Sequence, residues 1–306
     1  MDEKLGTILL TGGLGQLGYF TYLKLNCQYN ICIVDDLSNA KVEPPEDVQF
    51  IKKRLPDEEI FEKLPDIDFI IHLAAQISIT KSIEKPIYDA YSNIYGTLDL
   101  LEYARKKNVK KFIYISSSGT FGNPQYLPVD EKHPRNPISP YGLSKLVGEN
   151  YVEMYNDLYG LNTVSLIPFN FYSPLQNEND PYAGVIFKFL TAAKRGSNLT
   201  IFGDGRQTRD FINVKDVARA LELALIKKTS SKSFNIGSGK ATSIVDLANM
   251  VLQISDKNLD ITFQPAIKGE IKESYCSIEK AAKELDFSPE ISLHDGLKDM
   301  YEKIIL

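Results

Sequence analysis

Short apolar runs alternate with longer amphipathic stretches along the first half of the chain. The runs predict strands, whereas the stretches between them repeat apolar residues at helical spacing and predict helices. We predict strands over residues 7–11, 31–34, 69–75, 112–115 and 163–167, and helices over 15–26, 86–107 and 140–159. Nearly continuous apolar strands that alternate with helices are typical of a parallel sheet covered on both faces, a doubly wound α/β fold.

The second half of the chain has a different texture. Residues 170–181 are rich in proline, asparagine, aspartate and serine, which indicates a loop, and the segments after them are shorter. Glycines at 203–205 and 237–239 mark tight turns. We therefore predict a large N-terminal sheet domain and a smaller C-terminal domain, with the chain crossing between them more than once.

Composition and charge exclude several classes of protein. The chain has 306 residues and a formal net charge of −5, so it lacks the basic excess of a nucleic-acid-binding protein. No apolar run is long enough for a membrane span, and residues 1–4 lead into an apolar strand without the leader of an exported protein. We expect a cytoplasmic protein with neither a nucleic-acid nor a membrane partner. The histidines are too scattered for zinc-ligand spacing, so we expect no metal site.

A glycine-rich segment joins the first predicted strand to the first predicted helix. Residues 11–18 read TGGLGQLG, in which Gly13, Gly15 and Gly18 fit the pattern G-x-G-x-x-G. Glycine permits a tight turn and close approach of the backbone to a pyrophosphate, and the helix N-terminus supplies unpaired N–H groups. Asp35 ends the second predicted strand about 20 residues later, where a carboxylate binds a ribose 2′-hydroxyl. The pattern predicts a dinucleotide, and the charge of Asp35 favours NAD over NADP.

A tyrosine and a lysine four residues apart begin the helix predicted over 140–159. Tyr141 and Lys145 share a helix face, so the lysine cation is expected to lower the pKa of the phenol. The phenolate can take a proton from a sugar hydroxyl while a hydride leaves the carbon that bears this hydroxyl. Serines 116–118 end a strand, where α/β sheets bind substrates, and one of them can hydrogen-bond that hydroxyl. Tyr103 and Lys107 have the same spacing without such a strand end, and we assign them to a solvated helix face.

With further motifs, these residues resemble the extended short-chain dehydrogenase/reductase family, most closely its UDP-hexose 4-epimerase-like branch. The resemblance covers nearly the whole chain and implies a Rossmann sheet with a smaller C-terminal α/β domain. It implies an NAD-binding domain over 1–168, to which 211–236 return, and a nucleotide-sugar-binding domain over 169–210 and 237–306. The matching motifs are TGGLGQLG at 11–18, Asp35 and Asp36 with Asn39, HLAA at 72–75, Asn93 with Gly96 and Thr97, Ser116 and Ser117, SPYGLSK at 139–145, Phe169 and Asn170, IFGDGRQTRDFINVKDVA at 201–218, and FNIGSG at 234–239.

The resemblance also implies a role for each matching residue. Ser117, Tyr141 and Lys145 correspond to the catalytic residues of the family. Asn93 corresponds to a cofactor contact, with an alternative in which its amide bonds a backbone carbonyl inside the helix. The implied cofactor contacts are Gly12, Gly15, Gln16, Leu17, Gly18, Asp35, Asp36, Asn39, Leu55, Leu73, Ala74, Ala75, Asn93, Tyr141, Lys145 and Phe169. The implied contacts to a UDP-sugar are Ser118, Asn170, Thr200, Ile201, Phe202, Arg209 and Ser274.

Three sites depart from the family pattern. Lys53 and Arg54 stand where the family has Gly-Asp, whose aspartate holds the adenine amino group. Ile167 and Ile267 stand where the family has arginines, the second of which binds the diphosphate. An isoleucine cannot form the paired hydrogen bonds with which an arginine binds a phosphate. The sequence therefore leaves open whether the nucleotide is UDP or another one.

The resemblance implies NAD-dependent 4-epimerisation of a UDP-sugar, by removal and return of hydride at C4. A bulky tyrosine at the position of Ser274 would exclude N-acetyl groups, so its serine implies both the UDP-glucose/galactose and the N-acetylhexosamine pairs. Alternatives are a UDP-glucuronate epimerase, a 4,6-dehydratase, a decarboxylase, or an NAD-binding sensor without activity. Dehydratases need an acid just after the catalytic serine, where this chain has Ser118 and Gly119. The helices at 86–107 and 141–159 resemble those that pair in a homodimer.

Overall fold

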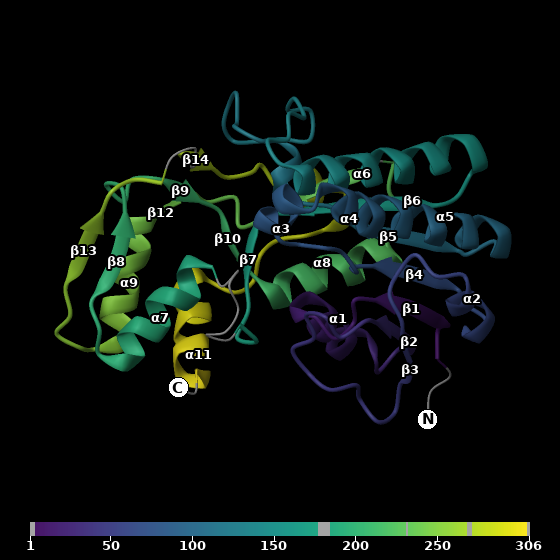
Figure 1. Cartoon of the computed structure of the whole chain (residues 1–306), viewed down its shortest axis with the longest axis horizontal. Coiled ribbons are helices and arrows are strands. Elements are labelled where there is room, and N and C mark those ends of the chain that lie inside the picture. The colour runs from purple at the N-terminus through teal and green to yellow at the C-terminus, as the bar shows by residue number, and fades with distance from the viewer. Residues whose placement is uncertain (1–3, 177–183, 231, 268–270, 305–306) are drawn as a thin grey trace.

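A seven-stranded sheet, in which all neighbouring strands are parallel, forms the centre of the molecule (Figure 1). The computed structural model describes residues 4–176, 184–230, 232–267 and 271–304. In spatial order the strands are β11 (Ser233–Ile236), β6 (Thr163–Pro168), β5 (Lys111–Ile115), β4 (Phe69–His72), β1 (Thr7–Thr11), β2 (Asn30–Asp35) and β3 (Gln49–Lys52). The doubly wound parallel sheet expected from the sequence is confirmed.

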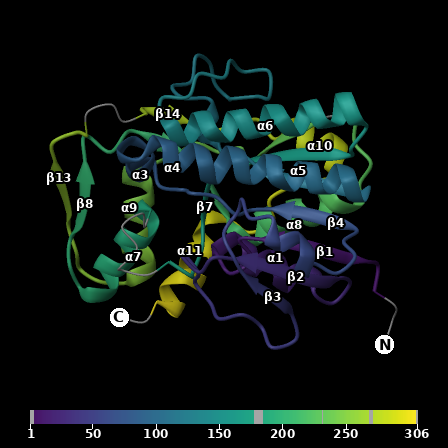
Figure 2. The same ribbon diagram turned by 45° about the vertical axis from the view of Figure 1, so that its right-hand side comes forward.

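Helices cover both faces of this sheet. Successive strand residues point to opposite faces, so Ile8 and Leu10 pack into one core cluster and Leu9 into another. Both faces are buried, which is why the strands are apolar at nearly every position. In Figures 1 and 2, α5 and α6 run along one side and α1 and α8 along the other. The first cluster includes α1 (Gln16–Leu25), α8 (Val214–Ile226) and α10 (Glu279–Leu285), and the second α2 (Glu59–Lys63), α5 (Gly96–Lys107) and α6 (Pro140–Tyr159).

A smaller unit lies beside the sheet, on the left in Figure 1. The chain enters it more than once, because β11 returns to the edge of the large sheet. Helix α10, residues 279–285, falls in the stretch predicted to belong to the second domain, yet it packs into the core of the sheet. The division into two domains stays a prediction. The unit's third core cluster joins α7 (Val185–Arg195), β8 (Leu199–Phe202), α9 (Ile244–Ser255) and α11 (Leu293–Lys303). Its strands pair as β8 with β13 (Ile261–Gln264), β9 (Thr208–Arg209) with β12 (Thr242–Ser243) and β14 (Glu273–Ser274), and β10 (Phe211–Asn213) with β7 (Asn170–Tyr172).

The helix predicted over 86–107 is one continuous helical run with a π-helical turn inside it. Tyr103 in this run is buried and stacks on Phe61, with ring centroids 4.8 Å apart, so its assignment to a solvated face was wrong. The run consists of α4 (Pro86–Ala90), η1 (Tyr91–Tyr95) and α5, with α3 (Ile79–Glu84) before it. No helix in the described part of the chain has both the length and the apolar character needed to span a membrane.

The strand predicted over 69–75 is shorter in the structure. β4 ends at His72, because the following residues leave the sheet to pass along the glycine loop. There Leu73 donates to the carbonyl oxygen of Thr11 at 3.1 Å, and Ala74 donates to the hydroxyl of Thr11 at 3.3 Å. The backbone after β4 is thereby pressed against the backbone after β1.

Candidate active site

A cavity of about 780 Å³ opens at the carboxyl ends of the central strands. Parallel strands end along one edge of a sheet, so loops distant in the sequence meet there. Of the predicted cofactor contacts, the lining includes Gly12, Gly15, Gln16, Leu17, Gly18, Asp35, Asp36, Asn39, Leu55, Leu73, Ala74, Ala75, Tyr141, Lys145 and Phe169. It also includes Ser117 and two of the predicted substrate contacts, Ser118 and Asn170.

The glycine loop gives the cavity a surface of bare backbone. Gly12 has φ +68°, and a Cβ on Gly18 would lie 2.2 Å from the carbonyl oxygen of Gly12. Gly15 caps α1 without a side-chain hydrogen bond, so no side chain occupies the positive end of this helix. The Oε1 atom of Gln16 is buried and has no hydrogen-bond partner among the described residues. A backbone cradle, an uncapped helix N-terminus and an unused acceptor fit the pyrophosphate and ribose of NAD.

Two aspartates at the end of β2 line the cavity beside the glycine loop, and they differ in their hydrogen-bond partners. Asp35 is 8% exposed and accepts hydrogen bonds from the N–H groups of Leu14 at 3.1 Å and Leu37 at 2.8 Å. Burial raises its pKa against these two hydrogen bonds. Asp36 pairs with the Nε of Arg54 at 2.5 Å, and that guanidinium lies 5.4 Å from the ring centroid of Tyr88. The basic residue that replaces the family's aspartate is therefore held by an acid within the cavity wall.

The three predicted catalytic residues meet at the end of β5. Ser139 caps α6 by accepting from Gly142 N–H at 3.1 Å, which fixes the helix turn that carries Tyr141. A Cβ on Gly142 would lie 2.5 Å from the carbonyl oxygen of Gly119, so the helix and the serine-bearing loop touch through backbone. This close approach brings the hydroxyl of Ser117 into hydrogen bonding with that of Tyr141.

Burial changes the charge balance that the sequence predicts for this group. It raises the pKa of Tyr141, and the hydrogen bond from Ser117 offsets only part of that rise. It also lowers the pKa of Lys145 to about 7, against the nearby carboxylates of Glu149 and Asp89. The Nζ atom of Lys145 lies 4.2 Å from the ring centroid of Tyr114. The expected lowering of the tyrosine pKa is therefore wrong for the protein alone, because burial of Tyr141 itself disfavours the phenolate.

Asn93 does not line the cavity. It is 1% exposed, and its Oδ1 atom accepts from the N–H of Gln76 at 2.7 Å. Its Nδ2 atom donates to the carbonyl oxygen of Gln76 and to the Oγ of Ser144, both at 3.0 Å. The side-chain amide of Asn93 links the loop after β4 to α6. Asn93 therefore supports residues of the cavity wall and is not itself part of that wall.

The remaining predicted sugar contacts lie in the smaller unit, outside the cavity lining. Thr200, Ile201 and Phe202 follow one another in β8, and Ile201 is 1% exposed within the third core cluster, so only its backbone is available. Arg209 of β9 and Ser274 of β14 are direct partners in a parallel pair. The structure thus brings these two predicted contacts together, although they are far apart in the sequence.

Several lining residues were not singled out from the sequence as site residues. Lys81 lies with its Nζ 4.4 Å from the ring centroid of Tyr88, at the side of the cavity where Arg54 pairs with Asp36. Ser92 lines the cavity with a buried hydroxyl that has no partner among the described residues. These side chains come from α3, α4 and η1, and no local motif marks them, because their place depends on how the helical run packs.

Comparison with known proteins gives a consistent family. The family model described as the NAD dependent epimerase/dehydratase family matches residues 8–237. A UDP-glucose 4-epimerase of Mycolicibacterium smegmatis is 33% identical, over 96% of this chain and 97% of its own length.

Two solved structures share the whole architecture. The UDP-glucose 4-epimerase of Thermotoga maritima, solved with UDP-glucose, has a TM-score of 0.91 and 38% identity, over 97% of this chain and 98% of its own. A UDP-N-acetylglucosamine 4-epimerase of Methanobrevibacter ruminantium, in complex with UDP-N-acetylmuramic acid, has a TM-score of 0.91 and 32% identity, over 99% of this chain and 98% of its own.

Proposed function

The chain belongs to the NAD-dependent epimerase/dehydratase family, and from this premise we propose that it interconverts UDP-hexoses, with or without an N-acetyl group, that differ at C4. NAD is its cofactor, and it is an isomerase. The resemblance to the extended short-chain dehydrogenases/reductases is thereby confirmed. The observation that carries the proposal is the meeting of Ser117, Tyr141 and Lys145 on the cavity that also holds the NAD-fitting glycine loop.

Each of these three residues has a defined part in the proposed reaction. Tyr141 takes the proton of the 4-hydroxyl, and Ser117 hydrogen-bonds the same oxygen as its charge changes. Lys145, with a pKa near 7, supplies a cation that stabilises the phenolate when protonated. NAD, when bound, supplies a reversible acceptor for the C4 hydride. The 4-keto sugar rotates in the cavity, takes the hydride back on the opposite face of C4 and takes the proton back from Tyr141, which gives the C4 epimer.

A dehydratase or decarboxylase fits the site less well. After Ser117 the loop continues into the 3₁₀ turn η2 (Ser118–Thr120), which carries no carboxyl or other group that is an acid at neutral pH. Elimination of water from a sugar needs such a group beside the leaving hydroxyl. In the proposed reaction, Tyr141 is the proton-transferring residue at this end of the cavity.

The direct test is product analysis with a panel of nucleotide sugars. We expect UDP-glucose and UDP-galactose, and the two UDP-N-acetylhexosamines, to give their C4 epimers by NMR without accumulation of soluble NADH. UDP-glucuronate belongs in the panel, since turnover of that substrate alone would point to the uronate epimerase. An unchanged panel with tight NAD binding would identify an NAD-binding sensor instead.

Ser274 is proposed as the residue that admits the N-acetyl group. It stands opposite Arg209 in the β9–β14 pair, and a serine leaves more room there than an aromatic ring. We expect Ser274→Tyr to remove activity on UDP-N-acetylhexosamines selectively, because added bulk rejects only the larger substrate. Glu273→Tyr is the matched control, since adjacent strand residues point to opposite faces. Equal loss on both sugar classes in Ser274→Tyr would exclude this role.

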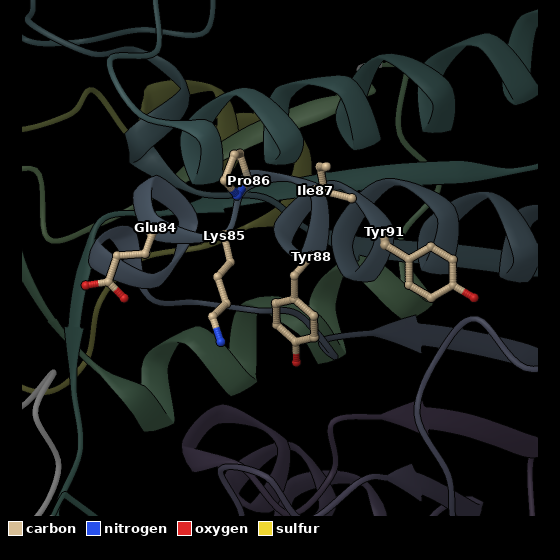
Figure 3. Close-up of a pocket in the computed structure, with 6 residues that line it drawn as sticks. All are labelled: Glu84, Lys85, Pro86, Ile87, Tyr88 and Tyr91. Carbon is tan, nitrogen blue, oxygen red and sulfur yellow. The ribbon is translucent and has the colours of Figure 1, made fainter.

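We also propose that a second copy of this chain covers the helical face formed by α3, α4, η1 and α6. Figure 3 shows Ile87 and Tyr91 on successive turns, with Tyr88 pointing to the other side of the helix. Ile87 is 85% exposed and Leu158 of α6 65%, and apolar side chains gathered on one face indicate a protein interface. The exposed members of this face are Ile79, Ile83, Ile87, Tyr91, Tyr95, Leu143, Met154, Leu158 and Tyr159. A homodimer joined by these helices is therefore the proposed assembly.

A further inference from the structure

A closed ring of hydrogen bonds lies behind the proposed catalytic serine. Glu149 accepts from the hydroxyl of Ser116 at 2.8 Å and from one arm of the Arg135 guanidinium at 3.0 Å. The other arm of Arg135 donates to the hydroxyl of Thr120 at 2.7 Å. Thr120 in turn donates to the carbonyl oxygen of Ser117 at 2.9 Å. Because Ser116 and Ser117 share a peptide bond, the ring closes at the serine itself.

Most of the ring is removed from solvent, although the Arg135 side chain is 18% exposed. Thr120 is 0% exposed, Ser116 2% and Glu149 7%, and the guanidinium of Arg135 lies 4.0 Å from the ring centroid of Phe121. A buried ion pair is seldom more stable than apolar side chains of similar volume, because both charges lose their hydration. Its more general value is that it enforces one geometry, since its hydrogen bonds have fixed directions.

The ring joins the two elements that carry the reacting groups. Tyr141, Lys145 and Glu149 follow one another at intervals of four residues along α6, so they share one helix face. Ser117 belongs to the loop that the ring clamps on both sides. Neither Arg135 nor Glu149 is among the residues that line the cavity, so both act on the reaction only through other residues.

We propose that Arg135 and Glu149 are positioning residues, which hold Ser117 against Tyr141 by clamping the loop at 116–120 to α6. The proposal rests on the catalytic roles given above to Ser117 and Tyr141. Loss of the ring should leave the NAD-binding loop untouched, because none of the four hydrogen bonds of the ring involves residues 11–18. It should instead lower the rate of the chemical step.

A matched pair of substitutions at Thr120 tests the ring. Thr120→Val keeps the shape of the side chain but removes both of its ring hydrogen bonds, whereas Thr120→Ser keeps the hydroxyl. In the NAD-loaded enzyme, we expect Thr120→Val to lower kcat by roughly 10- to 100-fold, because small misplacements of reacting groups cost that much. KM and NAD affinity should stay within about threefold of wild type, and Thr120→Ser should retain most of kcat. Equal kcat in the two variants would overturn the proposal.

A second readout needs no sugar substrate. The hydrogen bond from Ser117 lowers the pKa of Tyr141, so a displaced serine should raise it. The ultraviolet absorbance of tyrosinate is titrated in Thr120→Val and Thr120→Ser, each with and without Tyr141→Phe, so that the difference isolates Tyr141. We expect a higher pKa of Tyr141 in Thr120→Val only. If the wild type turned over no UDP-sugar, the proposed function would fail, and this titration would still decide whether the ring positions Ser117.

Arg135→Lys provides the same test if Thr120→Val does not fold. The lysine keeps a positive charge beside Glu149, but one ammonium group cannot replace the two-armed contact to Glu149 and Thr120. We expect a similar fall in kcat and a similar rise in the pKa of Tyr141. Wild-type kcat and an unchanged Tyr141 titration in Arg135→Lys would overturn the proposal.

Discussion

Tyr141 shows how single residues in this site balance burial against hydrogen bonding. Its pKa rises through burial and is partly restored by the hydrogen bond from Ser117. A group with this balance stays protonated at neutral pH in the protein alone, and a neighbouring positive charge increases the fraction that is present as phenolate. The same burial lowers the pKa of Lys145 to about 7, so small changes around the site alter its charge near neutral pH.

Replacing Tyr141 with phenylalanine removes the proposed base while keeping the ring. We expect kcat to fall by about 10²- to 10⁴-fold, the usual contribution of general base catalysis, with NAD still bound. Tyr103→Phe is the control, since Tyr103 has the same spacing to a lysine but stacks on Phe61 in the core. Initial rates with UDP-galactose measure both variants, and a Tyr141→Phe rate within a few-fold of wild type would contradict the assignment.

Asp35 is expected to set the choice between NAD and NADP. Its carboxylate repels a 2′-phosphate, whereas Lys53 and Arg54 of the same cavity wall would attract one. Asp35→Ala should therefore weaken NAD binding and narrow the gap between NAD and NADP in isothermal titration. Asp47→Ala, an exposed aspartate outside the cavity lining, should change neither affinity. A wild-type preference for NADP would refute the role of Asp35.

Elements meet in this protein through backbone contacts at glycines as well as through side chains. The turn between β1 and α1 presses on the residues after β4, and the start of α6 presses on the loop after β5. Such contacts set the distance between a helix and a strand end with little tolerance. They hold the glycine loop against the residues after β4, and the loop that carries Ser117 against the start of α6.

Two alanine substitutions in the glycine loop distinguish a glycine that close packing requires from a glycine whose position has room for a methyl group. A Cβ on Gly18 would lie 2.2 Å from the carbonyl oxygen of Gly12, whereas one on Gly15 would lie 3.4 Å from that oxygen. Gly18→Ala should lower the free energy of unfolding by about 1–3 kcal/mol, as overpacking does, and abolish tight NAD binding. Gly15→Ala should leave the free energy of unfolding of the protein without NAD nearly unchanged. Denaturant titration without NAD distinguishes them, and equal stability would show that the helix simply moves away.

At the scale of the whole molecule, the helical face of α3, α4, η1 and α6 carries nine large exposed apolar side chains. These helices contact one another and run together in Figure 2, and each of them carries exposed apolar side chains. The catalytic residues stand on the first turns of α6, in the same helix as part of that face. Association of two copies would therefore brace the helix that carries Tyr141.

Ile87→Glu tests the proposed dimer. A carboxylate at the centre of an apolar interface loses its hydration, so we expect the variant to be monomeric by light scattering where the wild type is dimeric. Ile226→Glu is the control, because Ile226 is also exposed, at 54%, but ends α8 on the other face of the sheet. A dimer that survives Ile87→Glu, or a monomeric wild type, would contradict the proposed interface.

The sequence by itself determined the features that depend on local pattern. Apolar runs located five of the seven strands of the sheet to within a few residues but missed β3 and β11, and the glycine spacing located the loop on which the cavity is built. Tyr141 and Lys145 were found because four residues make one helical turn, a property of any helix. The family resemblance extended this to about half of the cavity lining, which includes Leu73 and Phe169.

Only the tertiary structure decided what surrounds each of these residues. Tyr103 and Tyr141 have the same spacing to a lysine, yet one stacks in the core and the other lines the cavity. Asn93 lies behind the cavity wall. Arg135 and Glu149 form an ion pair behind Ser117, and no sequence motif predicts that pair. Burial, charge state and hydrogen bonding depend on neighbours distant in the sequence, and those neighbours are fixed only when the helices and strand ends pack together.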